Sequence, residues 1–321
     1  MTTSTSPLRI GIDVSKDTLE LCVEHTSHVT TLDNTPEAIA AWLSSLPPLP
    51  ILLAIEPTNT YHLDLLCAAD QAGHTIYLID GYRLSRYRDS IGQRAKTDAN
   101  DARLLLRYLC HEQSELRAWT RPPEGYLQVQ RLLRRRAQLV KTRVALRQSL
   151  SGIEAIQEAS QALFDQIDVL ERLILKQLEQ HMKTLGWEDD QQRCQAMEGV
   201  GVLTSIALTA TYHRGAFSGA DAFIAFIGMD VRVRDSGRMR GRRKLTKKGD
   251  PQLRRLLYMA AMTARRSATW KPFYERMRSR GLAPIQALVA LARKLARVAF
   301  SLLKHQTQYQ PKSPSNACAS T

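Results

Sequence analysis

Arg94-Ala-Lys-Thr-Asp-Ala-Asn-Asp-Ala-Arg-Leu-Leu105 places two carboxylates, Asp98 and Asp101, three residues apart where a helix is expected to begin. Residues at positions i and i+3 lie on one face of a helix, so the two carboxylates can lean toward one point. Such a pair suits a hard cation like Mg²⁺, which prefers oxygen ligands in an octahedron. It is also typical of solvated acids at the positive end of a helix dipole. The other acids of the chain decide between these readings.

The sequence around this stretch alternates between short apolar runs and helical patterns. The run at 51–55 is continuously apolar, as expected for a strand buried on both faces, and Thr35-Pro36 is typical of a helix start. The expected elements, in order, are strands over 8–14, 18–24 and 28–32, a helix over 35–46, a strand over 51–55, a helix over 61–72, a strand over 75–79, a helix from about 82 and the helix opened by Asp98.

This β-β-β-α-β-α-β-α order is that of the ribonuclease-H-like fold, whose first three strands form an antiparallel meander. In that fold a carboxylate on the first strand, one after the fourth strand and one or two on the last helix converge on metal ions. Asp13, Glu56 and the Asp98/Asp101 pair occupy those places. Without the fold argument, Asp13 is an ordinary strand-end residue and Glu56 a turn acid before proline. With it, the four acids predict a site for one or two Mg²⁺ ions that act on a phosphodiester.

Charge is distributed unevenly along the chain, whose formal net charge is +14. Residues 1–125 carry 11 Lys and Arg against 16 Asp and Glu, so the remaining residues carry the whole positive excess. A basic surface attracts polyphosphate, whereas an acidic one repels it unless a cation lies between. Nucleic acid together with a metal ion accounts for both parts; the alternative is a merely soluble basic protein.

Composition indicates the cellular compartment and the role of the cysteines. No apolar run approaches the roughly 20 residues that span a bilayer, and the N-terminus lacks the apolar region of a signal peptide. We therefore expect a cytoplasmic, nucleoid-associated protein without membrane contact. The five cysteines are scattered and form no C-x-x-C motif, so they indicate neither a zinc site nor a disulfide framework.

A long helical arm is expected after a linker at 112–125. Leucines or isoleucines recur at sevens at Leu132, Leu139, Leu146 and Ile153, and a second apolar pattern includes Leu163, Ile167, Leu170, Ile174, Leu178 and Leu185. Both patterns predict coiled-coil seams, in a projecting hairpin or a dimerisation arm. The first helix carries an acid-free basic run that favours phosphate contact over simple solvation: Arg134, Arg135, Arg136, Lys141 and Arg143 are the candidates.

The remaining chain is predicted to be mostly helical and basic. After a second linker at 187–190, Gly199-Val-Gly201 is typical of a helix-hairpin-helix, whose backbone can approach phosphate, or of a plain helical turn. Ser218 is expected to cap a helix over 219–227. Residues 231–249 carry nine Lys or Arg and one acid. Candidate nucleic-acid contacts there are Arg238, Arg240, Arg242, Arg243, Lys244, Lys247 and Lys248, together with Gly199 and Gly201.

Six stretches together resemble the DEDD-type insertion-sequence transposases, also called bridge-RNA-guided recombinases. They are Gly11-Ile-Asp-Val-Ser-Lys16, Ile55-Glu-Pro-Thr-Asn-Thr-Tyr61, Lys96-Thr-Asp-Ala-Asn-Asp-Ala-Arg103, Gly199-Val-Gly201, Phe223-Ile-Ala-Phe-Ile-Gly228 and Leu253-Arg-Arg-Leu-Leu-Tyr-Met259. The resemblance covers about residues 8–305. It implies a RuvC-like catalytic domain (8–115), a coiled-coil arm (125–188) and a C-terminal transposase domain with the helix-hairpin-helix (192–304). The tail (305–321) is rich in Gln, Ser and Pro, and we expect it to be disordered.

The resemblance also implies a reaction. Asp13, Glu56, Asp98 and Asp101 match the family's four metal-binding acids, and its nucleophilic serine falls on Ser236. In the family this serine forms a covalent 5′-phosphoserine intermediate with DNA, and a structured bridge RNA pairs with donor and target DNA. The resemblance further implies an oligomer, a dimer or tetramer, in which the acids and the serine come from different protomers. From the residues alone, Asp235-Ser-Gly237 is an ordinary turn sequence.

Two other functions use the same features. A RuvC-like Holliday-junction endonuclease would use the four acids with water as the nucleophile. A non-catalytic nucleic-acid-binding scaffold would use the basic surface alone. The recombinase differs from both because it requires Ser236 and a covalent protein–DNA adduct.

Overall fold

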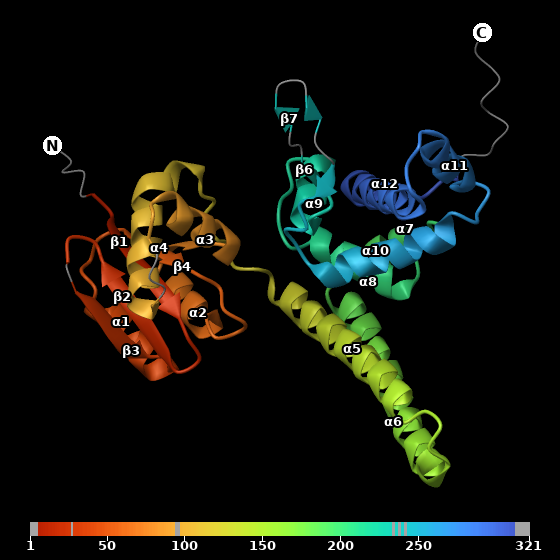
Figure 1. Cartoon of the computed structure of the whole chain (residues 1–321), viewed down its shortest axis with the longest axis horizontal. Helices are drawn as coiled ribbons and strands as arrows, with labels where there is room; N and C mark the ends of the chain where they lie inside the picture. Colours follow the sequence, from red (N-terminus) through yellow and green to blue (C-terminus); the bar gives the residue numbers. More distant parts are fainter. Residues whose placement is uncertain are drawn as a thin grey trace. The chain divides into compact units, whose positions relative to one another are not determined.

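The computed structural model describes residues 6–26, 28–93, 97–232, 235–236, 239–240 and 243–311, with the backbone alone at 235, 236, 239 and 240. The chain divides into two compact units, residues 1–121 and 122–321, each described here by itself (Figure 1). No helix in the described ranges combines the length and the apolar character that a membrane crossing needs.

The first unit is a five-stranded mixed sheet with helices packed on it (Figure 1). Strand β1 pairs antiparallel with β2, which pairs antiparallel with β3; β4 and β5 run parallel to β1, in the order β3-β2-β1-β4-β5. The element order and the antiparallel meander agree with the ribonuclease-H-like prediction. The elements are β1 (Leu8–Val14), β2 (Thr18–Val23), β3 (Val29–Asp33), α1 (Pro36–Ser45), β4 (Ile51–Ile55), α2 (Leu63–Gln71), β5 (Thr75–Leu78), α3 (Gly81–Ser90), α4 (Asp98–Glu112) and the 3₁₀ turn η1 (Gln113–Glu115).

Local chemistry explains where these elements begin. All five residues of β4 are buried, which confirms the central strand expected from the apolar run at 51–55. Thr35 caps α1 by accepting a hydrogen bond from the Ala38 amide, and Pro36 is the first residue of that helix, as predicted.

Helix α4 rests directly on the backbone of β1 at Gly11. A Cβ atom at this glycine would lie 2.2 Å from the carbonyl oxygen of Ala102 and 2.3 Å from the amide nitrogen of Leu106. No side chain fits there, so glycine allows the helix and the strand to approach at backbone distance. Because Asp13 follows on β1 and Asp98 and Asp101 lie on α4, this contact fixes the spacing between the acids of the strand and those of the helix.

The predicted linker at 112–125 is partly wrong. Helix α4 extends to Glu112, η1 follows, and the Trp119 amide donates a hydrogen bond of 2.6 Å to the Ile76 carbonyl. The Trp119 side chain also packs against the core of the first unit. The folded part of this unit therefore extends beyond residue 115.

The second unit is mostly helical, and its core joins the base of the arm to the C-terminal helices. The predicted linker at 187–190 is wrong: Glu188 begins a helix, and Asp190 is buried and accepts hydrogen bonds from Arg193 and Gln306. The helices are α5 (Glu124–Ser149), α6 (Gln157–Thr184), α7 (Glu188–Gln195), α8 (Val202–Tyr212), α9 (Ala220–Ile227), α10 (Pro251–Ala264), α11 (Lys271–Ser279) and α12 (Pro284–His305), with the 3₁₀ turn η2 (Glu154–Ile156).

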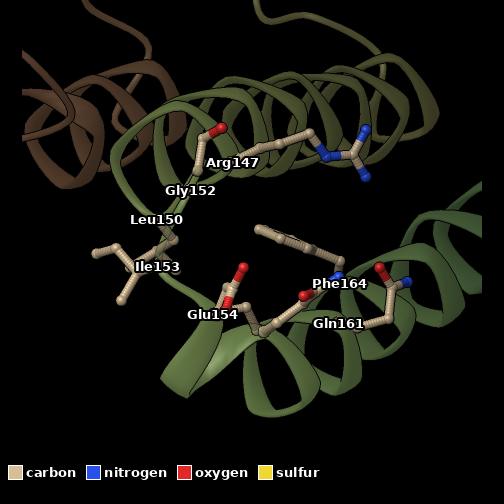
Figure 2. Close-up of a pocket in the computed structure, with 10 residues that line it drawn as sticks. Arg147, Leu150, Gly152, Ile153, Glu154, Gln161 and Phe164 are labelled. Carbon is tan, nitrogen blue, oxygen red and sulfur yellow. The ribbon is translucent and has the colours of Figure 1, made fainter.

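Helices α5 and α6 form an antiparallel pair, the arm, whose register differs from the prediction (Figure 1). Helix α5 ends at Ser149, so Ile153 lies in the connecting turn and is exposed. Leu163 and Leu170 are exposed as well, whereas Phe164 and Ile167 are buried. At the tip, a hollow of about 430 Å³ lies between the two helices. Arg147 lies over the Phe164 ring, and Ile153, which also lines the hollow, has its side chain turned away from that ring (Figure 2).

Glu171 on α6 is a buried acid in the arm, 7% exposed. It pairs with Arg136 at 2.9 Å and with Arg143 at 3.2 Å, and Arg143 also pairs with Asp168. Two positive charges of α5 are thus balanced by acids of α6.

We expect Glu171→Ala to destabilise the arm by about 2 kcal/mol, because it leaves the partly buried Arg136 without its carboxylate and Arg143 paired with Asp168 alone. Hydrogen–deuterium exchange of arm peptides would measure the free energy of local opening. Glu179→Ala, at an exposed position of the same helix, is the control and should leave exchange unchanged. Equal protection in the two variants would contradict the prediction.

Two predictions for the C-terminal part of the chain differ from the structure. Ser218 does not cap α9, because the N-cap is Gly219 and no side-chain cap bond is present. Residues 305–311 of the predicted disordered tail are ordered: His305 ends α12, and the Tyr309 hydroxyl donates a hydrogen bond of 2.6 Å to Glu198. The tail residues 312–321 lie outside the described residues.

Candidate functional site

Asp13 and Glu56 lie at the C-terminal ends of two adjacent parallel strands. Ile12 on β1 is the register partner of Ile55 on β4, and the two strands run parallel. The next residue of each chain segment is an acid, so both carboxylates lie at the same edge of the sheet. This edge is the one expected from the sequence.

Helix α4 supplies the other two acids. The Thr97 side chain accepts a hydrogen bond of 3.3 Å from the Asn100 amide, and Asp98 is the first residue of the helix. Asp98 is exposed, whereas Asp101, one turn later, is only 4% exposed. The backbone contact at Gly11 holds this end of α4 close to β1.

The pKa of Asp13 indicates that the charges of the other three acids act on this carboxyl group. Its pKa is raised from 3.8 to about 6, first by burial and then by the negative charges of Asp101, Asp98 and Glu56. A backbone hydrogen bond with Val14 opposes this rise. Like charges that raise a carboxyl pKa in this way repel one another and are relieved by a proton or a cation.

Helix α3 borders the acids. Arg88 on α3 donates a hydrogen bond of 2.5 Å to Oδ1 of Asp101. A Cβ atom on Gly81, the first residue of α3, would lie 2.3 Å from Oε1 of Glu56, so this carboxylate lies against the start of the helix. Arg88 was missed in the sequence; its one signal is its position one turn after the buried Leu84.

The four acids suit a divalent cation in the type of their donor atoms. Oxygen donors are the ligands that Mg²⁺ prefers, and the pKa of Asp13 is raised first by burial and then by the negative charges of the other three acids. Among the described residues, no group of three or more His, Cys, Asp or Glu side chains lies close enough together to hold a metal ion. The acids thus act on one another electrostatically but do not surround a metal-sized space, as expected of carboxylates that repel one another.

The raised pKa of Asp13 predicts a pH dependence. A carboxyl whose pKa is higher in the folded state favours folding at low pH, and this contribution is lost as the pH rises from about 4 to 6. In metal-free protein, Asp13→Asn should therefore be more stable than the wild type above pH 6, with the difference fading toward pH 4. We expect on the order of 1 kcal/mol, since the partial exposure of the side chain weakens the shift.

Thermal melting of both proteins in EDTA between pH 4.5 and 7.5 would measure this difference. A constant stability difference over the whole range would contradict the prediction.

The predicted nucleic-acid contacts fall into two groups on the arm. Arg134, Arg135 and Lys141 are exposed. Arg136 and Arg143 are partly buried and make ion pairs with Glu171. The exposed three therefore remain the better candidates for phosphate contact.

Gly199 and Gly201 differ in their surroundings. Gly199 has a φ of +86°, and a Cβ there would lie 2.5 Å from the Ala260 carbonyl oxygen, so packing against α10 explains this glycine. Gly201 is exposed at the start of α8, where a Cβ would meet nothing within 4 Å. Of the two, Gly201 has a backbone open to a phosphate.

The basic segment at 231–249 contains short antiparallel ladders that the sequence did not indicate. Strand β6 (Val231–Arg232) pairs with β9 (Lys244–Leu245), and β7 (Asp235–Ser236) pairs with β8 (Met239–Arg240). Ser236 thus lies on a strand whose backbone pairs with Met239.

The predicted basic contacts in this segment are only partly described. Arg243, Lys244, Lys247 and Lys248 are exposed. Arg238 and Arg242 lie outside the described residues, as do the side chains of Ser236 and Arg240.

Two relatives cover nearly the whole chain. A pilin gene-inverting protein of Moraxella bovis is 24% identical over 318 residues, which are 94% of this chain and 98% of that protein. A probable family 20 transposase of Pseudomonas aeruginosa is 25% identical, with the same two coverages. Among solved structures, T. thermophilus RuvC in complex with a Holliday junction substrate matches 36% of this chain and 100% of that chain, at 14% identity and a TM-score of 0.26.

Two family models match separate parts of the chain. The model of DEDD transposases of the IS110 type matches residues 10–153, which include all four acids. The model described as transposase IS116/IS110/IS902 family matches residues 191–299, which include Ser236 and the basic segment. The chain therefore belongs to the IS110-type transposases.

Proposed function

We propose that this transposase is a metal-dependent DNA recombinase of an insertion sequence, with a covalent phosphoserine intermediate and an element-encoded bridge RNA as guide. The observation that carries the proposal is the clustering of the four acids: together with burial, the charges of Asp101, Asp98 and Glu56 raise the pKa of Asp13. A site of this kind is suited to bringing a cation to the negatively charged backbone of DNA.

Asp13, Glu56, Asp98 and Asp101 would hold one or two Mg²⁺ ions. When bound, such ions neutralise charge on the attacking and leaving oxygens of a phosphodiester. Ser236 attacks the phosphorus through Oγ and gives up its proton. An Oγ–P bond forms, the P–O3′ bond breaks, and the 3′ oxygen leaves and takes up a proton. The DNA 5′ end is then held as a phosphoserine ester until a second 3′ hydroxyl displaces it.

One observation favours recombination over simple cleavage. The name of the Moraxella bovis relative refers to inversion of a gene, and an inversion requires that cut ends be rejoined. A phosphoserine ester conserves the bond energy for rejoining, whereas hydrolysis by a junction endonuclease would lose it. The exposed lysines of the basic segment, Lys244, Lys247 and Lys248, supply charge for the DNA and RNA backbones.

The proposal includes an assembly. Donor and target DNA and the bridge RNA are the partners, and the acids of one protomer meet Ser236 of another in a dimer or tetramer. The reaction takes place in the cytoplasm, on the nucleoid.

The test is an adduct assay with the full-length protein, Mg²⁺ and labelled DNA carrying the ends of the element. RNA transcribed from the DNA flanking the gene is added or left out. We expect a covalent protein–DNA adduct on a denaturing gel, present with Mg²⁺ and RNA and absent with EDTA. Cleavage without any adduct would support the junction endonuclease instead, and an adduct that forms equally well without RNA would remove the guide from the proposal.

A further inference from the structure

Arg88 is a mostly buried arginine beside the acid site. Its Nη2 lies 2.5 Å from Oδ1 of Asp101, and the two side chains are only 13% and 6% exposed. The two residues come from different helices, α3 and α4, so the bond also joins the helices that border the acids.

This arginine has few alternative roles. Its Nε is buried and has no hydrogen-bond partner among the described residues. An arginine does not lose its proton in a protein, so a permanent positive charge lies beside Asp101. Burial of a guanidinium with an unsatisfied donor is unfavourable, and the bond to Asp101 is what offsets it.

Asp101 faces in two directions. Arg88 engages its Oδ1, while the next residue of α4, Ala102, has its carbonyl oxygen against Gly11 of β1, two residues before Asp13. A charge-assisted bond to one oxygen of a carboxylate fixes the rotation of the whole group. The second oxygen, Oδ2, is then the atom that can serve as a ligand toward Asp13.

We propose that Arg88 is a positioning residue, which holds Asp101 by Oδ1 so that Oδ2 is presented to a divalent cation shared with Asp13. The inference rests on the proposed function, since the cation is part of it. Partners that orient a ligating side chain in this way strengthen metal binding by about 10- to 100-fold. A direct contact between Arg88 and a DNA phosphate is the competing role, which the low exposure of its side chain disfavours.

The test measures cation binding without nucleic acid, so that activity does not enter the readout. Full-length protein is stripped of metal and titrated with Mn²⁺, and the free ion is followed by electron paramagnetic resonance. We expect Arg88→Met to weaken Mn²⁺ binding at the acid site about 10- to 100-fold. Arg88→Lys keeps the charge but offers no fork of donors, so its loss should be intermediate. Arg83→Met removes an exposed arginine of the same helix and should change the affinity less than about twofold.

A double variant shows whether Arg88 acts through Asp101. In an Asp101→Asn background, Arg88→Met should produce no further loss of Mn²⁺ affinity, whereas a further loss would mean that Arg88 acts elsewhere. If Arg88→Met does not fold, as judged by circular dichroism, the Arg88→Lys titration decides the matter, and an unchanged affinity overturns the inference.

The two proposals fail in different ways. If Asp13→Asn and Asp101→Asn leave Mn²⁺ binding unchanged, the acids do not form a cation site, and the proposed function fails with the inference. If those variants lose the ion but Arg88→Met binds it normally, only the role of Arg88 is overturned. Normal Mn²⁺ binding together with weakened DNA binding in Arg88→Met would assign Arg88 to the phosphate contact.

Discussion

Replacing Asp13 with Asn should reduce adduct formation and DNA cleavage by at least about 10³-fold while leaving the first unit folded. Asp13 lies on β1 where the charges of the other three acids converge. Loss of its carboxylate weakens the hold on a cation that contributes several kcal/mol to the transition state, and each 1.4 kcal/mol is a factor of ten in rate. The amide has nearly the same shape and carries no charge, so it relieves repulsion instead of adding strain.

The adduct assay with labelled DNA and Mg²⁺ measures this effect, with circular dichroism as the check on folding. Asp17→Asn is the matched control, because Asp17 is an exposed acid in the turn that follows β1; it should react like the wild type. Full adduct formation by Asp13→Asn would remove the acid site from the mechanism and favour a nucleic-acid-binding scaffold.

Ser236→Ala should abolish the covalent adduct while leaving DNA and Mn²⁺ binding intact. The alanine side chain offers no oxygen to attack phosphorus, and removal of an enzyme's nucleophile costs up to about 10⁶-fold in rate. The four acids belong to the other unit of the chain, so the substitution leaves all four carboxylates in place.

Two comparisons make this result specific. A variant that still cleaves DNA without forming an adduct would indicate water as the nucleophile, as in a junction endonuclease. Thr246 is a second hydroxyl in the basic segment, and it donates a hydrogen bond to Asp230. Thr246→Val should keep the adduct; if instead this variant loses it and Ser236→Ala retains it, the nucleophile has been assigned to the wrong residue.

Much of the first unit could be predicted because its signals are local. The apolar run at 51–55 could only be a buried strand, and Thr97 and Thr35 are capping residues at the helix starts where the structure places them. Asp13 and Glu56 were found because the order of elements puts both at one edge of the sheet. Their roles as metal ligands remain predictions.

Contacts between distant residues could not be predicted in the same way. Arg88 reads as one more basic residue on an exposed helix, and only the packing of α3 on α4 brings it to Asp101. Glu171 falls among apolar residues of α6, yet arginines of α5 allow it to be buried. Asp190 was assigned to a linker because charged residues usually lie in solvent, but Arg193 and His213 pair with it inside the second unit.

The predicted register of the arm is wrong for a physical reason. A strict repeat of seven was counted from Leu132 to Ile153, but α5 stops at Ser149, so the last of these positions falls in the turn. The pattern of the second helix was counted separately from Leu163, but α6 packs with a different face inward. The inward face of α6 therefore passes through Phe164 and Glu171 instead of Leu163 and Leu170.

The bare backbone contact at Gly11 gives a criterion for judging drifted copies of this gene. A copy could keep codons for all four acids and Ser236 and still be inactive, because even one methyl group at residue 11 would meet the backbone of α4 at 2.2 Å and force the helix from the strand. Surveys that count intact elements by their acidic residues alone would then overestimate them. Residue 11 should be scored together with the acids.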